Sequence, residues 1–499
     1  MRFFRLPELL VLNFLVVFST AACAADSRRP NVIFFLVDDW GWTGANCFGS
    51  DLYETPNIDR LAAEGVRFTD GYAACTVCSP TRAAFMTGMY PARSHVTDWI
   101  PGYFSSRTDE QKSVYPLMPP DWTQVLEHDH TTIAEAMHDA GYRTLHTGKW
   151  HLTPSTDDAS VLNDYYPDRH GFEVNIAGNQ WGAPGSYYFP FKRRGGRKSP
   201  VLNDPVANRT MNFPQIGKEG DYLTDVLTTA MLDQVESWKD EPFFVYFPFY
   251  NVHAPIQGRP DLVEKYEAKI DENAKHTNPH YAAMVTSVDE NIGRVMDQLE
   301  QWGIADNTII FLTGDNGGLD DGEGNPTENH PLREGKGSPY EGGTRVPTII
   351  KWPGATPTGV VCDEPVITID YYPTILEMTG VQGDAQHNRN VDGVSLVPIL
   401  KDPDASLQRE AIYWHYPHYH TGGSVPHSVV RAGDYRLIER QHENQVELYD
   451  LRNDIGETKD LAASMPSKAN ELRTMLHQWR QSVGAQPAVA NPLYQGNEK

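Results

Sequence analysis

The chain has 499 residues, of which 40% are hydrophobic and 22% are charged, and its formal net charge is −24. These values describe a globular protein long enough for one large domain and a smaller one. The negative charge argues against nucleic-acid binding, and an anionic ligand would need a local basic pocket because the overall field repels it. With five cysteines in the whole chain, disulfides cannot be the main scaffold.

The first residues have the three-part layout of a secretory signal peptide. A basic start (1–5) is followed by an apolar run (9–18) and by small residues (21–25). The apolar run is too short for a membrane span, so we expect residues 1–24 to be removed and the mature protein to be secreted or periplasmic. Lipid attachment at Cys23 is the weaker alternative, because the preceding Thr-Ala-Ala is a poor lipobox. No other stretch reaches membrane-spanning length.

Apolar runs alternate with helical patterns through most of the chain. This order predicts an α/β fold, with a large, mostly parallel sheet sandwiched by helices. The expected strands cover 31–37, 142–147, 243–249 and 308–312, and the expected helices cover 55–64, 131–140, 222–238 and 281–302. The last of these helices keeps a 3.6-residue apolar period, and Gly303 ends it.

The pattern changes in the last part of the chain. Short strands between 410 and 450 and an amphipathic helix over 470–483 predict a small antiparallel sheet with one helix, and the tail beyond Gly484 is expected to be loose. The predicted organisation is a signal peptide (1–24), a large α/β domain (25–405) and a small C-terminal α+β subdomain (406–499).

Polar side chains follow four of the expected strands. In chain order they are Asp38 with Asp39, Lys149 with His151, His253, and Asp315 with Asn316. Sites in open α/β sheets form just beyond the carboxyl ends of the strands, so we expect these groups to share one site. The aspartates and the asparagine offer only hard oxygen ligands, which suit Ca²⁺, or Mg²⁺ with more waters, and do not suit zinc or copper.

The segment Cys78-Ser-Pro-Thr-Arg82 is followed by Ala-Ala-Phe-Met-Thr-Gly, giving the pattern C-x-P-x-R-x-x-x-x-T-G. We expect a helix that starts at Pro80, with Ser79 as its N-cap. Cys78 and Arg82 would then lie at the positive end of the helix dipole, where an oxyanion is favoured. The segment therefore predicts a cradle for a tetrahedral anion that contains a modifiable nucleophile.

Cys75 and Cys78 also form a C-x-x-C pair, which leaves other interpretations open. Such a pair could be redox-active or could form half of a zinc site. A zinc site needs a second ligand pair, whereas the remaining cysteines are scattered, and no short thioredoxin-like βαβ unit frames a redox pair. A plain buried cysteine at a helix start is the third possibility.

Taken together, these segments resemble the type I sulfatases, the formylglycine-dependent enzymes of the alkaline-phosphatase-like superfamily. Besides the cysteine motif, the resemblance rests on residues 30–39, 55–61, 65–68, 141–152, 335–337, 340–347 and 447–450, and it spans about residues 30 to 465. The chain is most similar to bacterial N-acetylgalactosamine- or galactose-sulfate sulfatases. The resemblance implies an alkaline-phosphatase-like fold and the hydrolysis of sulfate esters.

The resemblance also implies two cofactors and a set of catalytic residues. A formylglycine-generating enzyme would convert Cys78 to formylglycine, and one calcium ion would bind at Asp38, Asp39, Asp315 and Asn316. A hydroxyl of the hydrated formylglycine would attack sulfur, while Arg82, Lys149 and Lys336 neutralise the sulfuryl oxygens. His253 or Lys336 would protonate the leaving oxygen, and His151 would help the second hydroxyl to expel sulfate.

The chain departs from the family pattern at a few positions. Thr81 stands where serine is commoner, Phe85 where leucine is, and Gly314 where serine often precedes the aspartate. Thr81 keeps the hydroxyl, so we expect the conversion of Cys78 to survive. None of the three changes alters a proposed catalytic group.

Aromatic and imidazole side chains make a sulfated carbohydrate a plausible substrate. Rings stack on sugar faces and imidazoles donate to sulfate or hydroxyl groups, so the candidates for sugar binding are Trp181, His415, His418 and His420. The alternative for the run 414–420 is an edge strand that buries its rings.

Two other functions remain open at this point. A phosphate or phosphonate monoester hydrolase of the same superfamily would share the fold, which does not fix the transferred group. A non-catalytic glycan-binding protein would result if Cys78 were never converted.

Overall fold

The computed structural model describes Met1 and residues 29–496, except 157, 192–209, 212–215, 272, 321–325, 422 and 443–444. Apart from Met1, the predicted signal peptide with Cys23 lies outside the described residues. Within the described part of the chain, no helix is both long and apolar enough to cross a membrane.

A sheet of nine strands forms the centre of the described structure, in the order β11-β2-β10-β9-β1-β8-β5-β6-β7. β10 runs antiparallel to both of its neighbours, and the other neighbouring strands pair in parallel. The predicted mostly parallel sheet is therefore confirmed. Its strands are β1 (Asn31–Val37), β2 (Val66–Phe68), β5 (Arg143–Thr147), β6 (Val174–Ile176), β7 (Thr210–Met211), β8 (Phe243–Pro248), β9 (Thr308–Gly314), β10 (Thr348–Lys351) and β11 (Val360–Cys362).

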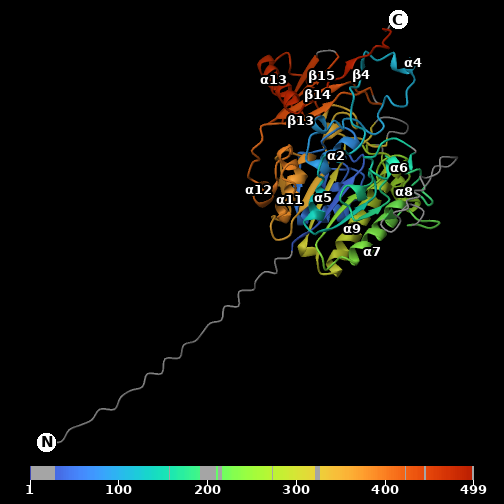
Figure 1. Ribbon diagram of the computed structural model, residues 1–499, viewed down its shortest axis with the longest axis vertical. Coiled ribbons are helices and arrows are strands. Elements are labelled where there is room, and N and C mark those ends of the chain that lie inside the picture. Colours follow the sequence, from blue (N-terminus) through green and yellow to red (C-terminus); the bar gives the residue numbers. More distant parts are fainter. Residues whose placement is uncertain are drawn as a thin grey trace.

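Helices cover both faces of this sheet, because its central strands are apolar on both sides. β1 is fully buried: Phe35 and Val37 belong to the core under one set of helices, and Phe34 and Leu36 to the core under the other. The two sets lie on opposite sides of the sheet in Figure 1. The first set is α1 (Pro56–Glu64), α7 (Leu223–Glu236) and α9 (Pro279–Gln301), and the second is α2 (Cys78–Thr87), α5 (Ile133–Asp139), α11 (Tyr371–Thr379) and α12 (Val397–Lys401).

The predicted strands and helices of the large domain are all present, with ends that differ by no more than two residues from the predicted ones. Short elements connect them: β3 (Gly71–Tyr72), α3 (Pro91–Ser94), α4 (Asp109–Lys112), β4 (Leu117–Met118), α6 (Ala159–Leu162), α8 (Pro260–Glu267), α10 (Glu341–Thr344), β12 (Val366–Ile367) and the 3-10 turns Asn46–Phe48, Pro167–Arg169, Ala305–Asn307, Thr368–Asp370 and His387–Arg389.

The C-terminal part forms the small antiparallel sheet that the sequence predicts. Its order is β13-β14-β15-β16, and α13 packs Leu472 and Leu476 into the same core as the sheet. That core also contains Tyr72 and Ala84, so it is continuous with the large domain next to α2 (Figure 1). The elements are β13 (Ile412–Tyr416), β14 (His427–Ala432), β15 (Tyr435–Arg440), β16 (Gln445–Asp450) and α13 (Pro466–Ser482).

The prediction of a loose tail is wrong for the residues up to 496. β17 (Val489–Ala490) pairs antiparallel with β4, and the Asn491 amide donates to the carbonyls of Lys112 and Tyr115. This segment is held by backbone and amide hydrogen bonds, and its Val489 side chain is exposed. Because the side chains of β17 are not buried, the sequence shows no apolar pattern from which the strand could be predicted.

Candidate active site

Cys78 is the first residue of α2, which begins two residues earlier than predicted. The residue before the helix is Val77, in extended conformation, and Pro80 lies in the first turn, where its missing N–H costs no intrahelical bond. The predicted N-cap role of Ser79 is therefore wrong. Its hydroxyl instead donates to the His151 carbonyl (2.9 Å) and accepts from the Ile100 N–H (3.2 Å). Cys78 still lies at the positive end of the helix.

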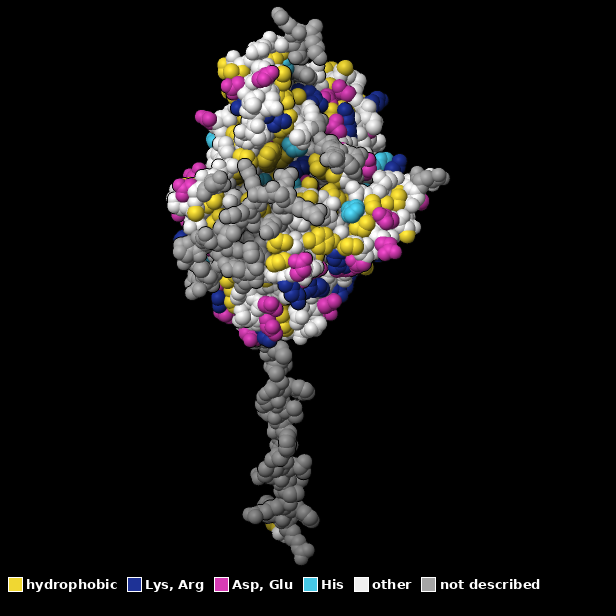
Figure 2. Space-filling view, turned by 90° about the vertical axis from the view of Figure 1, so that its right-hand side faces the viewer, with side chains coloured by type: hydrophobic (Ala, Val, Ile, Leu, Met, Phe, Trp, Pro, Cys, Tyr) yellow, Lys and Arg dark blue, Asp and Glu magenta, His cyan; other side chains and the backbone are white. Residues whose placement is uncertain are grey.

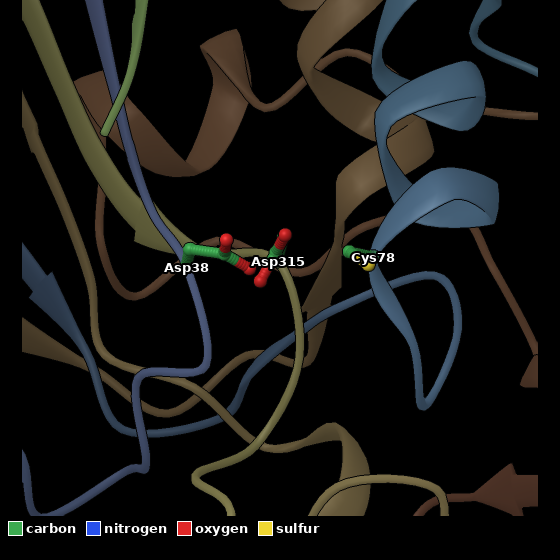
Figure 3. Close-up of side chains that lie close together, drawn as sticks. All are labelled: Asp38, Cys78 and Asp315. Atoms are coloured by element: carbon green, nitrogen blue, oxygen red, sulfur yellow. The ribbon is translucent and has the colours of Figure 1, made fainter. Parts of the chain in front are cut away.

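Two aspartates face Cys78 from the ends of neighbouring strands. Asp38 follows β1 and Asp315 follows β9, and these strands pair in parallel up to Val37 and Gly314. Figure 3 shows the two carboxylates close together, with Cys78 across from them at the start of α2. One carboxylate oxygen of each aspartate and the Cys78 sulfur all lie within 4.8 Å of one another. The two aspartates therefore lie together at the carboxyl ends of neighbouring strands, as the strand pattern predicted.

Arg82 and Lys149 are bound to these carboxylates. Arg82 Nη2 lies 2.6 Å from Asp315 Oδ2 and 3.7 Å from Asp38 Oδ1, and Lys149 Nζ lies 2.6 Å from Asp38 Oδ2. All four side chains are fully buried, and neither cation is among the described residues that line the adjoining cavity. The two cations thus compensate buried negative charge, which a buried carboxylate requires.

Asp39 gathers a second set of groups. Lys336 Nζ is 2.7 Å from Asp39 Oδ1, the Asn316 amide donates to the same oxygen at 2.8 Å, and His253 Nε2 is 3.7 Å from Oδ2. Burial alone raises the pKa of Asp39, but the neighbouring Lys336 ammonium brings it below its ordinary value. Burial lowers the pKa of Lys336, but Asp39 outweighs this and raises it, so Lys336 is protonated. Burial lowers the pKa of His253 to about 3, so its ring is neutral.

The oxygen ligands at this site fit a calcium ion. Asp38 Oδ1 and Asn316 Oδ1 are buried and have no hydrogen-bond partner among the described residues, although buried oxygens normally have one. Burial and the neighbouring Asp315 raise the pKa of Asp38 well above its ordinary value. A divalent cation would take up the free oxygens and remove the repulsion between the carboxylates, and an all-oxygen set is what calcium prefers.

His151 presents one definite ring nitrogen to residue 78. Its Nε2 lies 2.6 Å from the Ile100 carbonyl oxygen, and its Nδ1 lies 3.4 Å from Cys78 Sγ. A carbonyl can only accept, so Nε2 carries the hydrogen and Nδ1 is the free acceptor. Burial and then Lys149 keep the pKa of His151 well below its ordinary value, so the ring is neutral. His151 has a φ of 59°, a left-handed conformation that is costly for this residue and is typical of functional sites.

A cavity of about 700 Å³ lies next to Cys78, His253 and Lys336. On the face shown in Figure 2, hydrophobic and histidine side chains gather around a hollow. The other lining residues are Trp99, Ile100, Pro101, Tyr103, His151, Ser155, Thr156, Gln180, Trp181, Gly182, Ala183, His420 and Thr421. The loop 99–103 was not predicted from the sequence, although its aromatic residues so soon after the cysteine motif are a usable signal.

The four candidate sugar-binding residues separate into two pairs. Trp181 and His420 line the cavity, and His420 lies against Gly337, whose φ of 86° and lack of Cβ leave room for the ring. His415 and His418 are buried and do not line it. His415 bonds Ser428 Oγ and the Gln486 carbonyl (2.8 and 2.9 Å), and His418 Nε2 lies 2.9 Å from Thr97 Oγ1. For these two, the alternative of buried rings on and next to an edge strand is the better description.

The four cysteines among the described residues are unbridged. Cys47, Cys75, Cys78 and Cys362 are free thiols, and Cys75 is buried with its backbone N–H bonded to Thr81 Oγ1 (3.0 Å). The possible metal ligands grouped with Cys78 are the carboxylates of Asp38 and Asp315, which do not make the cysteine and histidine set of a structural zinc site.

Comparison with known proteins gives one consistent result. The family model described as Sulfatase matches residues 30–381, and the one described as N-sulphoglucosamine sulphohydrolase, C-terminal, matches residues 335–483. A sulfatase of Formosa agariphila is 33% identical, with 91% of this chain and 89% of that protein covered. The N-acetylgalactosamine-6-sulfatase of Canis lupus familiaris is 30% identical, with 77% and 69% covered.

The fold agrees with the sequence matches. The crystal structure of Ps i-CgsB superimposes with a TM-score of 0.73 at 26% identity, covering 92% of this chain and 94% of that one. The sulfatase model alone spans well over half of the sequence, and it contains every described residue that lines the cavity or binds the carboxylates except His420 and Thr421. The chain therefore belongs to the sulfatase family and is a sulfuric ester hydrolase.

Proposed function

We propose that the protein removes sulfate from a sulfated carbohydrate, with residue 78 as the nucleophile after its conversion to formylglycine and with one bound calcium ion. The observation that carries the proposal is the placement of Cys78. Its sulfur lies at a cavity, 3.4 Å from a neutral imidazole nitrogen and within 4.8 Å of oxygens of two buried carboxylates. A formylglycine-generating enzyme would act on the chain before it can work.

The cysteine sulfur marks where the oxygens of the converted residue would lie. As a hydrated aldehyde, residue 78 would supply one hydroxyl to attack sulfur and a second to release sulfate, which a serine or cysteine cannot do without water attacking a sulfated enzyme. His151 Nδ1 is the acceptor 3.4 Å away, so His151 takes the proton of the second hydroxyl. The Ile100 carbonyl holds the tautomer in which this nitrogen is free.

The proposed calcium ligands are Asp38, Asp39, Asp315 and Asn316. When bound, calcium would supply positive charge beside residue 78 and the sulfuryl oxygens. Lys149 and Arg82 hold Asp38 and Asp315 in place through ion pairs of 2.6 Å. Their charge acts on the sulfate through the short distances of a buried site, where screening by water is weak.

Lys336 is the better candidate for the proton donor to the leaving oxygen. Both Lys336 and His253 line the cavity, and the Lys336 ammonium carries three N–H donors, only some of which Asp39 can accept. His253 Nδ1 lies 2.8 Å from the Ala254 carbonyl, which accepts its hydrogen, so the neutral ring has no hydrogen on Nε2 to donate. We therefore assign proton donation to Lys336 and the orientation of the substrate to His253.

A carbohydrate substrate is supported by the side chains around the cavity. Trp99, Tyr103 and Trp181 can stack on sugar faces, and His420 can donate to a sugar hydroxyl. Ps i-CgsB has been crystallised with a neocarrahexaose, and it is 25% identical to this chain in that structure. Together with the resemblance to N-acetylgalactosamine-6-sulfatases, this favours N-acetylgalactosamine or galactose sulfates as the first sugars to test.

The test is a comparison of aryl sulfate and aryl phosphate esters, followed by defined sulfated mono- and disaccharides. We expect kcat/KM for the aryl sulfate to exceed that for the phosphate, and at least one galactose-type sulfate to be turned over. A preference for phosphate by orders of magnitude would overturn the proposal in favour of a phosphate monoester hydrolase. Turnover of the aryl sulfate without any sulfated sugar would overturn only the carbohydrate part.

A further inference from the structure

A buried carboxylate behind the cavity wall is not explained by the reaction as derived so far. Asp98 is 1% exposed and lies at the start of the loop 98–103, four residues of which line the cavity. No residue of this loop belongs to the sequence motifs of the site. The carboxylate nevertheless has hydrogen-bond donors on both oxygens.

The Asp98 side chain is hydrogen-bonded to both ends of the loop that follows it. Oδ1 accepts the N–H of Trp99 at 2.9 Å, and Oδ2 accepts the N–H of Tyr103 at 3.0 Å. The backbone from 99 to 103 is thereby fixed at both ends by one side chain. Four residues of this loop line the cavity, namely Trp99, Ile100, Pro101 and Tyr103.

The small C-terminal sheet holds the same carboxylate from behind. The Tyr416 hydroxyl, on β13, donates to Asp98 Oδ1 at 2.8 Å, and His418 Nδ1 lies 3.7 Å from Oδ2. His418 is fixed in turn by Thr97, the residue before Asp98. Three hydrogen-bond donors therefore point at Asp98 from two parts of the chain that are more than 300 residues apart.

The loop that Asp98 holds is also the loop that orients His151. The Ile100 carbonyl accepts from His151 Nε2 at 2.6 Å, and the Ile100 N–H donates to Ser79, which donates to the His151 carbonyl. Ile100 thus fixes the ring and, through Ser79, the backbone of His151. A shift of the loop would move the nitrogen that faces residue 78 or release the tautomer that leaves it free.

We propose that Asp98 is a positioning residue for catalysis, which transmits the rigidity of the C-terminal sheet through Ile100 to His151. Tyr416 and His418 support Asp98, so His418 serves the site from behind the cavity wall and not as a sugar ligand. The inference rests on the proposed role of His151 as the base. It means that the C-terminal sheet affects the rate of reaction through Asp98, in addition to packing against the large domain.

Asp98→Asn is the first variant, because an amide keeps the shape but replaces one acceptor by a donor that faces an N–H. Mass spectrometry gives the fraction of molecules in which residue 78 is formylglycine, and each kcat is divided by that fraction. We expect the corrected kcat on an aryl sulfate to fall about 10- to 100-fold, as is usual when a group that orients a catalytic residue is lost. Tyr416→Phe removes a single hydrogen-bond donor to Asp98 and should lower kcat to a smaller extent. This variant replaces Asp98→Asn as the test if Asp98→Asn does not fold.

Tyr413→Phe is the matched control. Tyr413 lies on the same strand as Tyr416, packs its ring on Trp479 at 4.8 Å, and belongs to a different core cluster. We expect wild-type kcat from this variant. A loss equal to that of Tyr416→Phe would show a general effect of the sheet and would overturn the assignment to Asp98.

A double-mutant cycle with His151→Ala distinguishes positioning from general stability. If Asp98 acts through His151, the double variant is no slower than His151→Ala alone, whereas independent effects multiply. If the two losses of kcat multiply in the double variant, or if Asp98→Asn has wild-type kcat, the inference about Asp98 is wrong while the proposed function stands. Wild-type kcat in His151→Ala would instead overturn the proposed role of His151, and the inference with it.

Discussion

At the scale of single residues, the site separates charges that hold one another from groups that face the cavity. Arg82 and Lys149 are bound to Asp315 and Asp38, while Lys336, His253 and His420 reach the cavity. The sequence placed Asp38, Lys149, His253 and Asp315 at one edge of the sheet, because strand carboxyl ends meet there. Arg82, Lys336 and His420 were candidates on other grounds, namely the cysteine motif, the family resemblance and the run 414–420. The sequence could not say which cations face inward, since that depends on pairings between residues far apart in the chain.

His420 gives a prediction about substrate recognition. His420→Phe should raise KM for a sulfated sugar about tenfold, the loss expected for one hydrogen bond to a charged or polar group, and should leave KM for an aryl sulfate unchanged. His415→Phe is the control, since His415 lies outside the cavity lining. Steady-state kinetics with both substrates measure the difference. Equal KM values for the sugar in His420→Phe and the wild type would contradict the proposed contact.

At the scale of elements, the Thr81 hydroxyl connects the segment before Cys78 to helix α2, at a position where the family more often has serine. Thr81 Oγ1, on the first turn of α2, accepts the Cys75 N–H at 3.0 Å and lies 3.3 Å from the Cys75 carbonyl. The hydroxyl therefore ties the segment before Cys78 to the helix that carries it. The sequence predicted the importance of the hydroxyl from the family pattern, but not its partner.

Thr81→Val should lower the free energy of unfolding by about 1–3 kcal/mol, because it leaves the buried Cys75 N–H without an acceptor. Thr81→Ser keeps the acceptor and should lose less. Denaturant unfolding of the two variants measures the difference. Equal losses for valine and serine would show that the methyl group, and not the hydroxyl, matters at this position.

The start of α2 and the tail show what the sequence could not predict at this scale. Ser79 and Pro80 have the local features of a helix start, but tertiary bonds of Ser79 to Ile100 and His151 take its hydroxyl, and the helix begins at Cys78. The loop 98–103 and β17 have no periodic pattern, since single side chains and backbone bonds hold them. Periodic apolar segments, in contrast, were predicted to within two residues in the large domain.

At the scale of the whole molecule, buried neutral histidines make the fold sensitive to acid. His170 stacks on His128 and Trp150, and its ring nitrogens have no hydrogen-bond partner among the described residues. Burial lowers its pKa to about 3. Below about pH 6.5 the unfolded chain binds a proton at this residue that the folded protein does not, so stability is present above that pH and is lost as the pH falls towards 3.

His170→Phe keeps the stacking and removes the ionisable group. Between pH 7 and pH 5 the free energy of unfolding of the variant, relative to wild type, should rise by about 2 kcal/mol, at ~1.4 kcal/mol per pH unit below 6.5. Urea unfolding at the two pH values measures it, and the other titrating groups cancel because both proteins share them. The same difference at both pH values would contradict the buried neutral state of His170.

The central claim is that residue 78 works as formylglycine and not as the encoded cysteine. Mass spectrometry of the peptide around residue 78, isolated from active protein, tests it most directly. The account predicts a peptide lighter by the difference between a CH₂–SH and a CHO group, in a proportion that follows specific activity, and no turnover by Cys78→Ala. Full turnover from a protein in which every copy retains the thiol would contradict the account.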